Sequence, residues 1–303
     1  MTASNSHLLL ESSAWQEYQL ADSGDGLKLE IFGPYRLVRP EAQATWSQAL
    51  PRAHWAEADG VFRPTGEESG GHWDFRRKVA SKWEMSYPLS AQPESRLRFT
   101  AMTTPGRHLG VFPEAAAHWE FVFDAVKARS GEAKVLNLFG YTGLASLASA
   151  AAGASVTHVD ASKKSVTWAR ENQGLSHMED KPIRWIVDDA LKFVLREVRR
   201  DAHYDGIIIE PPKFGRGPKG EVWEIYRSLP RLMQACRQLL SRQPLFMILT
   251  LYAVRASGIH LAQTLAEATS AFGGRMESGE LVTRESSAGR LLSQAVFARW
   301  RGE

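Results

Sequence analysis

The chain has 303 residues, of which 44% are hydrophobic and 23% charged, an ordinary composition for a soluble globular protein. It is long enough for one large domain and a smaller one, and it contains no apolar run of the roughly 20 residues that a membrane-spanning helix needs. The net charge of +3 permits a polyanionic partner without requiring one. The single cysteine excludes an internal disulfide and a cysteine-based zinc site. Together with the missing apolar run, this leads us to expect a cytoplasmic protein without a metal or a membrane partner.

Short runs in which apolar and polar residues alternate occur in the first 95 residues, for example residues 27–31 and 35–38. Glycine and proline residues interrupt these runs, which indicates short antiparallel strands. We therefore expect residues 1–95 to form a small β-rich N-terminal domain, a candidate for substrate recognition.

From about residue 115, helical periodicity alternates with short apolar strands. The expected strands cover residues 134–139, 155–160, 183–187, 204–209 and 246–250. The expected helices cover residues 114–128, 162–174, 190–200 and 224–241, with an alanine-rich helix after the first strand. Apolar strands joined by helices indicate a parallel sheet that is covered on both faces.

The C-terminal end differs, because residues 276–284 and 291–300 flank a Ser-Ser-Ala-Gly turn that predicts an antiparallel hairpin. The predicted fold class is therefore α/β. We expect a Rossmann-like, doubly wound, mostly parallel seven-stranded sheet closed by that hairpin, in a domain that spans residues 96–303.

Polar residues and glycines follow three consecutive strands of the predicted sheet. The first strand ends in the turn NLFGYTG (137–143), which is either a simple strand–helix turn or a ligand site, since open α/β sheets bind ligands at this edge through free N–H groups of a helix N-terminus. This turn is not GxGxxG, which argues against a pyrophosphate cradle and an NAD-dependent oxidoreductase. The second strand ends in Asp160, which either accepts ribose hydroxyls or caps the next helix. Asp188 and Asp189 end the third strand, where an adenine amino group would lie, or they cap the helix that begins at Ala190.

The fourth strand ends in the turn EPPKF (210–214), whose two prolines stop the strand and leave backbone carbonyl groups free. The Glu210 carboxylate and a carbonyl in one cleft would hold the N–H groups of a substrate nitrogen while its lone pair attacks a methyl group. Phe214 offers an aromatic ring on which a base could stack. The alternative is a plain strand terminator.

A basic loop, GRGPKG (215–220), follows this turn. It either closes over a phosphodiester or is a solvated surface loop. Its charged residues, Arg216 and Lys219, are the candidate contacts to a nucleic acid.

The segments VLNLFGYTG, THVDAS, IVDDA and IIIEPPKFGRGPKGEVW resemble class I S-adenosylmethionine-dependent methyltransferases, specifically the group related to bacterial 23S ribosomal RNA large-subunit methyltransferases. The resemblance covers residues 105–255 and extends weakly into the N-terminal part. It implies S-adenosylmethionine as cofactor, with Asp160 at the ribose and Asp189 near the adenine. The residues that would line the methionine side are Phe139, Tyr141 and Gly143.

The resemblance also assigns two further segments. Phe112 and Glu114 match a segment that packs near the cofactor in relatives. Residues 210–213 match a catalytic Asp-Pro-Pro turn, with Glu210 in place of the usual aspartate, and the extra methylene leaves the role of Glu210 open. The set expected at the cofactor is Phe112, Glu114, Asn137, Phe139, Tyr141, Thr142, Gly143, Asp160, Ala161, Ser162, Asp188, Asp189, Ala190 and Glu210. The expected catalytic residues are Glu210, Pro211, Pro212 and Lys213, and the expected substrate contacts are Phe214, Arg216 and Lys219.

A missing cysteine narrows the chemistry. Relatives that methylate cytosine at carbon carry a nucleophilic cysteine just after the fifth strand, where this sequence has TLYA (250–253). Cys236 instead lies between Leu232 and Leu240 on an apolar helical stripe. The sequence therefore predicts an enzyme that methylates a base of ribosomal RNA, on nitrogen and without a cysteine nucleophile. A methyltransferase of a small molecule or protein, and a cofactor-binding, non-catalytic RNA-binding relative, are the alternatives, and the oligomeric state is open between monomer and homodimer.

Overall fold

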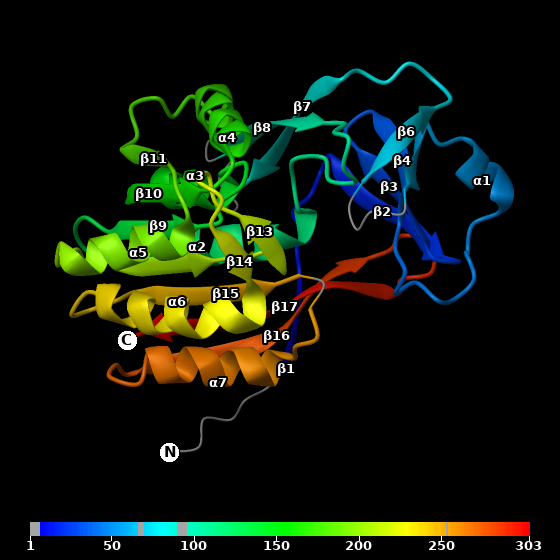
Figure 1. Cartoon of the computed structure of the whole chain (residues 1–303). Helices are drawn as coiled ribbons and strands as arrows, with labels where there is room; N and C mark the ends of the chain where they lie inside the picture. The colour runs from blue at the N-terminus through cyan, green and yellow to red at the C-terminus, as the bar shows by residue number, and fades with distance from the viewer. Residues whose placement is uncertain (1–6, 66–69, 90–95, 253) are drawn as a thin grey trace.

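The computed structural model describes residues 7–65, 70–89, 96–252 and 254–303 (Figure 1). Its central sheet consists of β1 (His7–Glu11), β9 (Lys134–Leu138), β10 (Ser155–Asp160), β11 (Ile183–Val187), β12 (Gly206–Ile209), β15 (Phe246–Leu251), β16 (Gly274–Arg284) and β17 (Leu291–Gly302). The strands lie in the order β1-β16-β17-β15-β12-β9-β10-β11. β17 runs antiparallel to both β15 and β16, and the remaining neighbours are parallel.

Helices cover both faces of this sheet. The helices are α2 (Ala116–Lys127), α3 (Leu144–Ala151), α4 (Lys163–Leu175), α5 (Ala190–Arg199), α6 (Ile225–Leu239) and α7 (Gly258–Ala268). α2 and α3 bury one face against Val135, Ile208 and Ile248. α5, α6 and α7 bury the other face against alternating residues of the same strands, such as Leu136 and Ile209. The predicted doubly wound α/β class with a C-terminal hairpin is confirmed.

The sheet has eight strands where the sequence predicts seven. The additional strand is β1, which pairs in parallel with β16, beginning with His7 opposite Ser278. β1 is an edge strand with only half-buried residues on its inner face, and its partner is distant in sequence. No local pattern therefore marks it as part of this sheet.

A second sheet confirms the expected β-rich N-terminal part. It contains β2 (Tyr18–Gly24), β3 (Leu27–Phe32), β4 (Tyr35–Pro40), β5 (Gly60–Pro64) and β6 (Gly71–Phe75), in that order, and α1 (Arg52–Ala56) lies between β4 and β5 in the chain. Trp55 of α1 packs on Leu29, Val38 and Val61 to form its small core.

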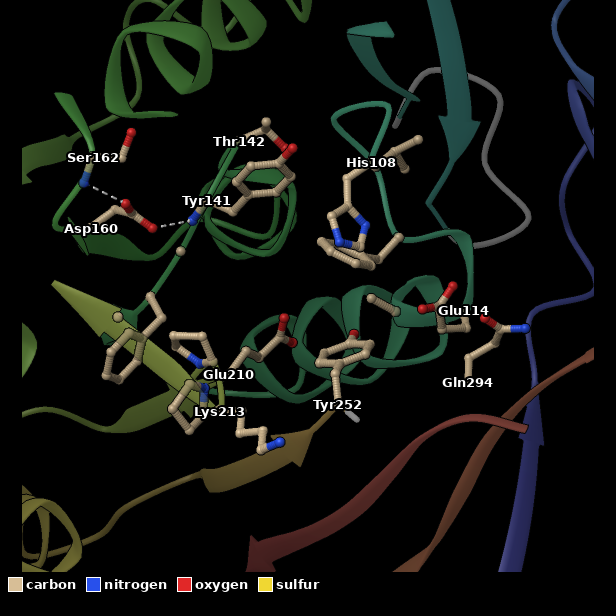
Figure 2. A pocket seen from close by; sticks show the side chains of 18 of the residues that line it. His108, Glu114, Tyr141, Thr142, Asp160, Ser162, Glu210, Lys213, Tyr252 and Gln294 are labelled. Carbon is tan, nitrogen blue, oxygen red and sulfur yellow. Dashed lines mark hydrogen bonds between the residues drawn. The ribbon is translucent and has the colours of Figure 1, made fainter. Parts of the chain in front are cut away.

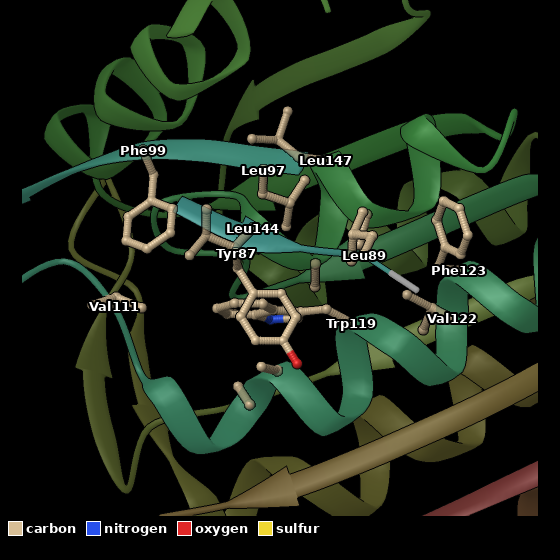
Figure 3. Packing of buried hydrophobic residues seen from close by; sticks show 14 of the residues in the cluster. Tyr87, Leu89, Leu97, Phe99, Val111, Trp119, Val122, Phe123, Leu144 and Leu147 are labelled. Carbon is tan, nitrogen blue, oxygen red and sulfur yellow. The ribbon is translucent and has the colours of Figure 1, made fainter. Parts of the chain in front are cut away.

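A hairpin of β7 (Lys82–Pro88) and β8 (Arg96–Met102) joins the two sheets in the chain. It packs on the helices of the central sheet, where Tyr87 and Phe99 lie with Trp119 in the main hydrophobic core (Figure 3). The Trp168 side chain of α4 donates a hydrogen bond to the carbonyl oxygen of Thr100 at 3.1 Å.

The tip of the β16–β17 hairpin reaches the N-terminal sheet. The hydroxyl groups of Ser23 and Ser287 donate to Glu285 and Asp22 at 2.6 and 2.7 Å, and Arg290 pairs with both acids. Asp22 and Glu285 are fully buried, so this contact is a structural joint between the two sheets.

Within the described ranges, no helix is long and apolar enough to cross a membrane.

Candidate active site

A cavity of about 750 Å³ lies at the carboxyl edge of the central sheet, within the size range of small-molecule sites. Figure 2 shows Asp160 and Tyr141 at one end, Glu114 and Gln294 at the other, and Glu210 between them. We refer to these as the Asp160 end and the Glu114 end. The edge is the one at which parallel sheets of this type bind ligands.

Backbone hydrogen bonds hold Asp160 in place. Its Oδ2 accepts from the Tyr141 N–H at 2.9 Å and its Oδ1 accepts from the Ser162 N–H at 2.8 Å. The N-cap of α4 is Ser162, whose hydroxyl oxygen accepts from the Ser165 N–H at 3.2 Å. Since capping falls to Ser162, the remaining lone pairs of Asp160 are available to a ligand. Burial raises the pKa of the Asp160 carboxyl, and the two N–H donors oppose that rise.

The turn after β9 has an unusual backbone. Phe139 and Tyr141 lie in the left-handed region, with φ of 58° and 49°. Non-glycine residues rarely adopt this conformation, and residues that do are concentrated at functional sites. A Cβ at Gly140 would collide with the ring of His158, so only glycine allows the turn to pass this close to β10.

Buried polar residues support the turn from below. The Asn137 side-chain amide donates to the Ser146 hydroxyl at 2.9 Å, and the Ser146 oxygen lies 3.0 Å from Nδ1 of His158. Burial lowers the pKa of His158 to about 3, so the imidazole is neutral. The Thr142 hydroxyl donates to the Gly110 carbonyl at 2.7 Å and fixes the segment that leads to Phe112.

The two acids after β11 have different environments. Asp189 lines the cavity and also caps α5, because its Oδ1 accepts from the Lys192 N–H at 2.9 Å. Asp188 lies outside the cavity and pairs with Arg196 at 2.8 Å. Both interpretations of Asp189 are thus compatible with its geometry, whereas Asp188 has a structural partner.

Glu210 lies directly after β12, and its side chain points into the cavity (Figure 2). Its Oε1 is shielded from solvent and has no hydrogen-bond partner. Burial, followed by the charge of Glu114, raises the pKa of Glu210 to about 7. The expectation of free carbonyl groups fails at Pro212, whose oxygen accepts from the Trp223 indole N–H at 2.7 Å. Pro212 therefore also anchors the segment that follows.

That segment is a short hairpin, and the predicted loop at residues 215–220 is only partly right, because residues 215 and 216 are in its first strand. β13 (Phe214–Arg216) pairs with β14 (Val222–Glu224), because backbone pairing and the Trp223 contact order residues that look like loop in composition. Phe214 is 55% exposed, and Arg216 is exposed at the rim of the cavity. Lys219 lies between the two strands, outside the cavity, and its backbone N–H donates to Glu221 at 2.9 Å.

Most of the predicted site residues meet in this one cavity. Those that line it are Phe112, Glu114, Asn137, Phe139, Tyr141, Thr142, Asp160, Ala161, Ser162, Asp189, Ala190, Glu210, Pro211, Pro212, Lys213, Phe214 and Arg216. Those outside it are Gly143, Asp188 and Lys219. Gly143, with φ of 85°, is the N-cap residue of α3 and packs under the turn against Ala169 and Trp185.

Sequence reasoning missed residues at the Glu114 end. Lys28 of β3 donates to the Gln294 side chain of β17 at 3.1 Å, and Arg39 of β4 forms a buried ion pair with Glu30 at 2.7 Å. His108 lies on the Phe112 ring, 5.0 Å between centroids, and burial with nearby cations lowers its pKa to about 3. These residues are far apart in sequence, so no spacing motif could reveal them.

Tyr252 directly follows β15, and its only signal in the sequence is its place in the stretch 250–253, where cytosine-methylating relatives carry a cysteine. Its ring lies 5.1 Å from that of Phe112, and its hydroxyl is shielded from solvent without a partner. Burial, followed by the charges of Glu210 and Glu114, raises the pKa of Tyr252. Ala253, the last residue of that stretch, lies outside the described residues.

In the described part of the chain, no group of three or more His, Cys, Asp or Glu side chains is arranged to hold a metal ion.

The expected place of Cys236 is confirmed. It is fully buried in α6 among the apolar residues of the central sheet's second face. Burial raises the pKa of its thiol, so a thiolate is disfavoured.

Comparisons with known proteins agree on one family. The family described as S-adenosylmethionine-dependent methyltransferase matches residues 45–277. The crystal structure of a protein described as the SAM-dependent methyltransferase from Agrobacterium tumefaciens has 47% identity, covers 98% of this chain and 94% of its own, and has a TM-score of 0.91.

Two further similarities are more distant. A ribosomal RNA large subunit methyltransferase K/L from Shewanella loihica is 30% identical over 193 residues, which are 63% of this chain and 26% of the relative. The chain thus matches about a quarter of the length of that relative. A candidate methyltransferase solved in complex with S-adenosylhomocysteine shares the fold, with a TM-score of 0.67 at 18% identity over 95% of this chain and 76% of its own.

Proposed function

This chain belongs to the family of S-adenosylmethionine-dependent methyltransferases, and we propose that it transfers the methyl group to a base nitrogen in ribosomal RNA. The observation that carries the proposal is Glu210. Its carboxylate lies in the cavity at the end of β12 with one oxygen, Oε1, that is buried and unpartnered. An acceptor N–H group would satisfy that oxygen, and a buried acceptor without a partner is otherwise unfavourable.

The residues at the Asp160 end fit the cofactor. Asp160 keeps lone pairs for ribose hydroxyls, and Asp189 adds a second carboxylate at the same edge. The left-handed turn at Phe139 and Tyr141 brings backbone groups close to the space between these acids and Glu210. S-adenosylmethionine, when bound, supplies an electrophilic methyl group on a sulfonium centre.

The chemistry that remains for the protein is to orient the acceptor and to remove a proton. An amino nitrogen that attacks a methyl group must lose one of its protons, and Glu210 can accept it. A general base is most effective when its pKa is near the working pH, and burial raises the pKa of Glu210 to about 7. The glutamate in place of the usual aspartate is thus compatible with the catalytic role that the resemblance implies. Cys236 is buried in α6, which supports a mechanism without a cysteine nucleophile.

Ribosomal RNA is proposed as the substrate because curated relatives are described as ribosomal RNA large subunit methyltransferases. We assign residues 96–303 to catalysis and residues 1–95 to substrate recognition, since β3 and β4 supply Lys28 and Arg39 to the Glu114 end. Within residues 1–95, β1 and β7 are the exceptions, because β1 pairs with the central sheet and Tyr87 of β7 lies in its core. The same proposal places the protein in the cytoplasm, where it would meet its substrate.

Nucleoside mass spectrometry of ribosomal RNA tests the proposal. Cells that lack the gene should lose one methylated nucleoside, and the wild-type gene should restore it, whereas the Glu210→Ala variant should not. An unchanged set of methylated nucleosides in both ribosomal RNAs would contradict a ribosomal RNA substrate and favour a small molecule or protein.

A further inference from the structure

Two unpartnered polar atoms meet in the active-site cavity. Among the described residues, the buried side-chain atoms without a hydrogen-bond partner are Trp83 Nε1, both ring nitrogens of His118, His158 Nε2, Glu210 Oε1, Thr250 Oγ1 and Tyr252 Oη. Of this set, Glu210 and Tyr252 line the cavity. Buried polar groups in native proteins are nearly always paired, so a pair of exceptions in one cavity indicates ligand contacts.

The two side chains come from neighbouring strands. β12 and β15 are paired in parallel, with Ile209 opposite Leu249, so the residues that follow both strands lie at the same edge of the sheet. Figure 2 shows Glu210 and Tyr252 on the same side of the cavity, and the Glu210 charge acts on the Tyr252 hydroxyl. The two groups are nevertheless not hydrogen-bonded to each other.

Their chemical roles are complementary. A carboxylate only accepts hydrogen bonds, whereas a phenol can donate one. Burial and the nearby carboxylates raise the pKa of Tyr252, so its hydroxyl keeps its proton at neutral pH and remains a donor. The contact with the Phe112 ring holds the Tyr252 ring in position. A ligand that satisfies both groups must present an N–H donor next to an acceptor atom.

We propose that Tyr252 binds the acceptor base by donating a hydrogen bond to an unprotonated ring nitrogen, while Glu210 accepts from the adjacent exocyclic amino group. This inference rests on the proposed function, since it takes the acceptor to be a base. It selects bases with an amino group beside an unprotonated ring nitrogen and excludes uracil. In the transfer, the amino nitrogen forms a bond to the methyl carbon, the electron pair of the broken C–S bond stays on sulfur, and the amino proton passes to Glu210. Tyr252 keeps its own proton throughout.

A fragment experiment tests this assignment without RNA. The protein loaded with S-adenosylhomocysteine is titrated by calorimetry with 2-aminopyrimidine and with aniline, which has the same amino group but no ring nitrogen. Wild-type protein should prefer 2-aminopyrimidine by about tenfold, the upper range of one neutral hydrogen bond. Tyr252→Phe should remove this preference, and Glu210→Ala should weaken both fragments.

Thr250→Val is the matched control. Thr250 also carries a buried hydroxyl without a partner, two positions earlier on β15, but it does not line the cavity. This variant should keep the preference for 2-aminopyrimidine. A preference that survives in Tyr252→Phe, or no binding of 2-aminopyrimidine to the wild-type protein at millimolar concentration, would overturn the inference.

An RNA assay separates the two proposals. With RNA from cells that lack the gene, Tyr252→Phe should lower kcat/KM by about fivefold to tenfold. Its Tm should not fall, because the lost hydroxyl has no partner in the folded protein. If the wild-type protein methylates no RNA while the fragment preference depends on Tyr252, the proposed function fails and the inference stands. If RNA is methylated and Tyr252→Phe matches the wild-type rate and preference, the inference fails and the function stands.

Discussion

The two ends of the active-site cavity are built in different ways. At the Asp160 end, the ligand-facing residues follow β9, β10 and β11, and backbone N–H groups hold the carboxylates of Asp160 and Asp189. At the Glu114 end, side chains from the N-terminal sheet and the C-terminal hairpin contact each other, as Lys28 and Gln294 do. The Asp160 end is therefore formed by three consecutive strand–turn–helix units. The Glu114 end forms only when the N-terminal sheet packs against the C-terminal hairpin.

This difference fits a division of tasks. Local units of fixed geometry are enough to hold the cofactor that we propose at the Asp160 end, whereas the Glu114 end, to which we assign substrate recognition, depends on the position of the N-terminal sheet relative to the central sheet. Glu210 and Tyr252, with their unpartnered oxygens, lie between the two ends. We therefore expect variants at the Asp160 end to change cofactor affinity, and variants elsewhere to change the reaction or acceptor affinity.

Glu210→Ala should have the largest effect. We expect single-turnover methyl transfer to fall by about a hundredfold or more, because an oriented contact to the acceptor is lost, with little change in the affinity for S-adenosylhomocysteine. The Glu210→Gln variant keeps the shape of the side chain and one acceptor oxygen, so its single-turnover rate should fall less. Rapid-quench assays for the rate and calorimetry for the affinity check this. Full single-turnover activity in Glu210→Ala would mean that the Pro-Pro turn only terminates the strand.

The same residue predicts a pH dependence of stability. The pKa of Glu210 is raised from 4.5 to about 7 in the folded protein, so the folded state keeps a proton that the unfolded chain releases above pH 4.5. The stabilising contribution is fully present below pH 4.5 and is lost as the pH rises through 7, by up to about 3 kcal/mol. Denaturant unfolding of the wild type from pH 5 to 8 should show this loss relative to Glu210→Gln. Parallel curves for the two proteins would contradict a raised pKa.

Asp160→Ala should weaken binding of S-adenosylhomocysteine by about 1.5–3 kcal/mol, the range for hydrogen bonds to a charged group. Asp160→Asn is the control, since it preserves the size of the side chain and one acceptor oxygen. Calorimetry measures both. Wild-type affinity in Asp160→Ala would reduce the role of Asp160 to holding the Tyr141 and Ser162 backbone.

The sequence predicts the Asp160 end well because each of its signals is local. β10 and β11 have the predicted bounds, and Asp160 and Asp189 lie at the predicted strand ends. The sequence predicts a loop at residues 215–220, but residues 215 and 216 belong to β13, whose pairing with β14 depends on contacts such as that of Trp223 with Pro212. For the same reason the sequence does not predict β1 or the Lys28, Arg39 and Gln294 side chains of the Glu114 end. Their positions depend on partners that are far away in the chain. The periodicity of hydrophobic residues and the residue types of turns are local signals and carry no information about such distant partners.

Arg290→Ala tests whether the joint between the sheets controls the Glu114 end. Arg290 bonds to Asp22 and Glu285 and donates to the Ser47 carbonyl at 2.9 Å. Its removal leaves two buried carboxylates with fewer partners, and we expect a loss of about 1–3 kcal/mol in the free energy of unfolding. RNA binding should weaken several-fold at temperatures where the variant is folded, and affinity for S-adenosylhomocysteine should not change. Equal loss of both affinities would show that the two ends are not independent.

The smallest effects should come from the β13–β14 hairpin, which borders the cavity on the outside. Arg216 is at the rim, whereas Lys219 lies between the strands, away from the cavity. If RNA passes over the hairpin, Lys219→Ala should weaken binding by no more than a few-fold, and the effect should shrink as salt rises, because one phosphate contact changes the salt slope by about one. Phe214→Ala should weaken binding to a similar extent at every salt concentration, since stacking does not release counterions. Filter binding at several salt concentrations distinguishes the two variants. A salt-independent loss in Lys219→Ala would show that this lysine acts through the local structure of the hairpin and not through RNA phosphate.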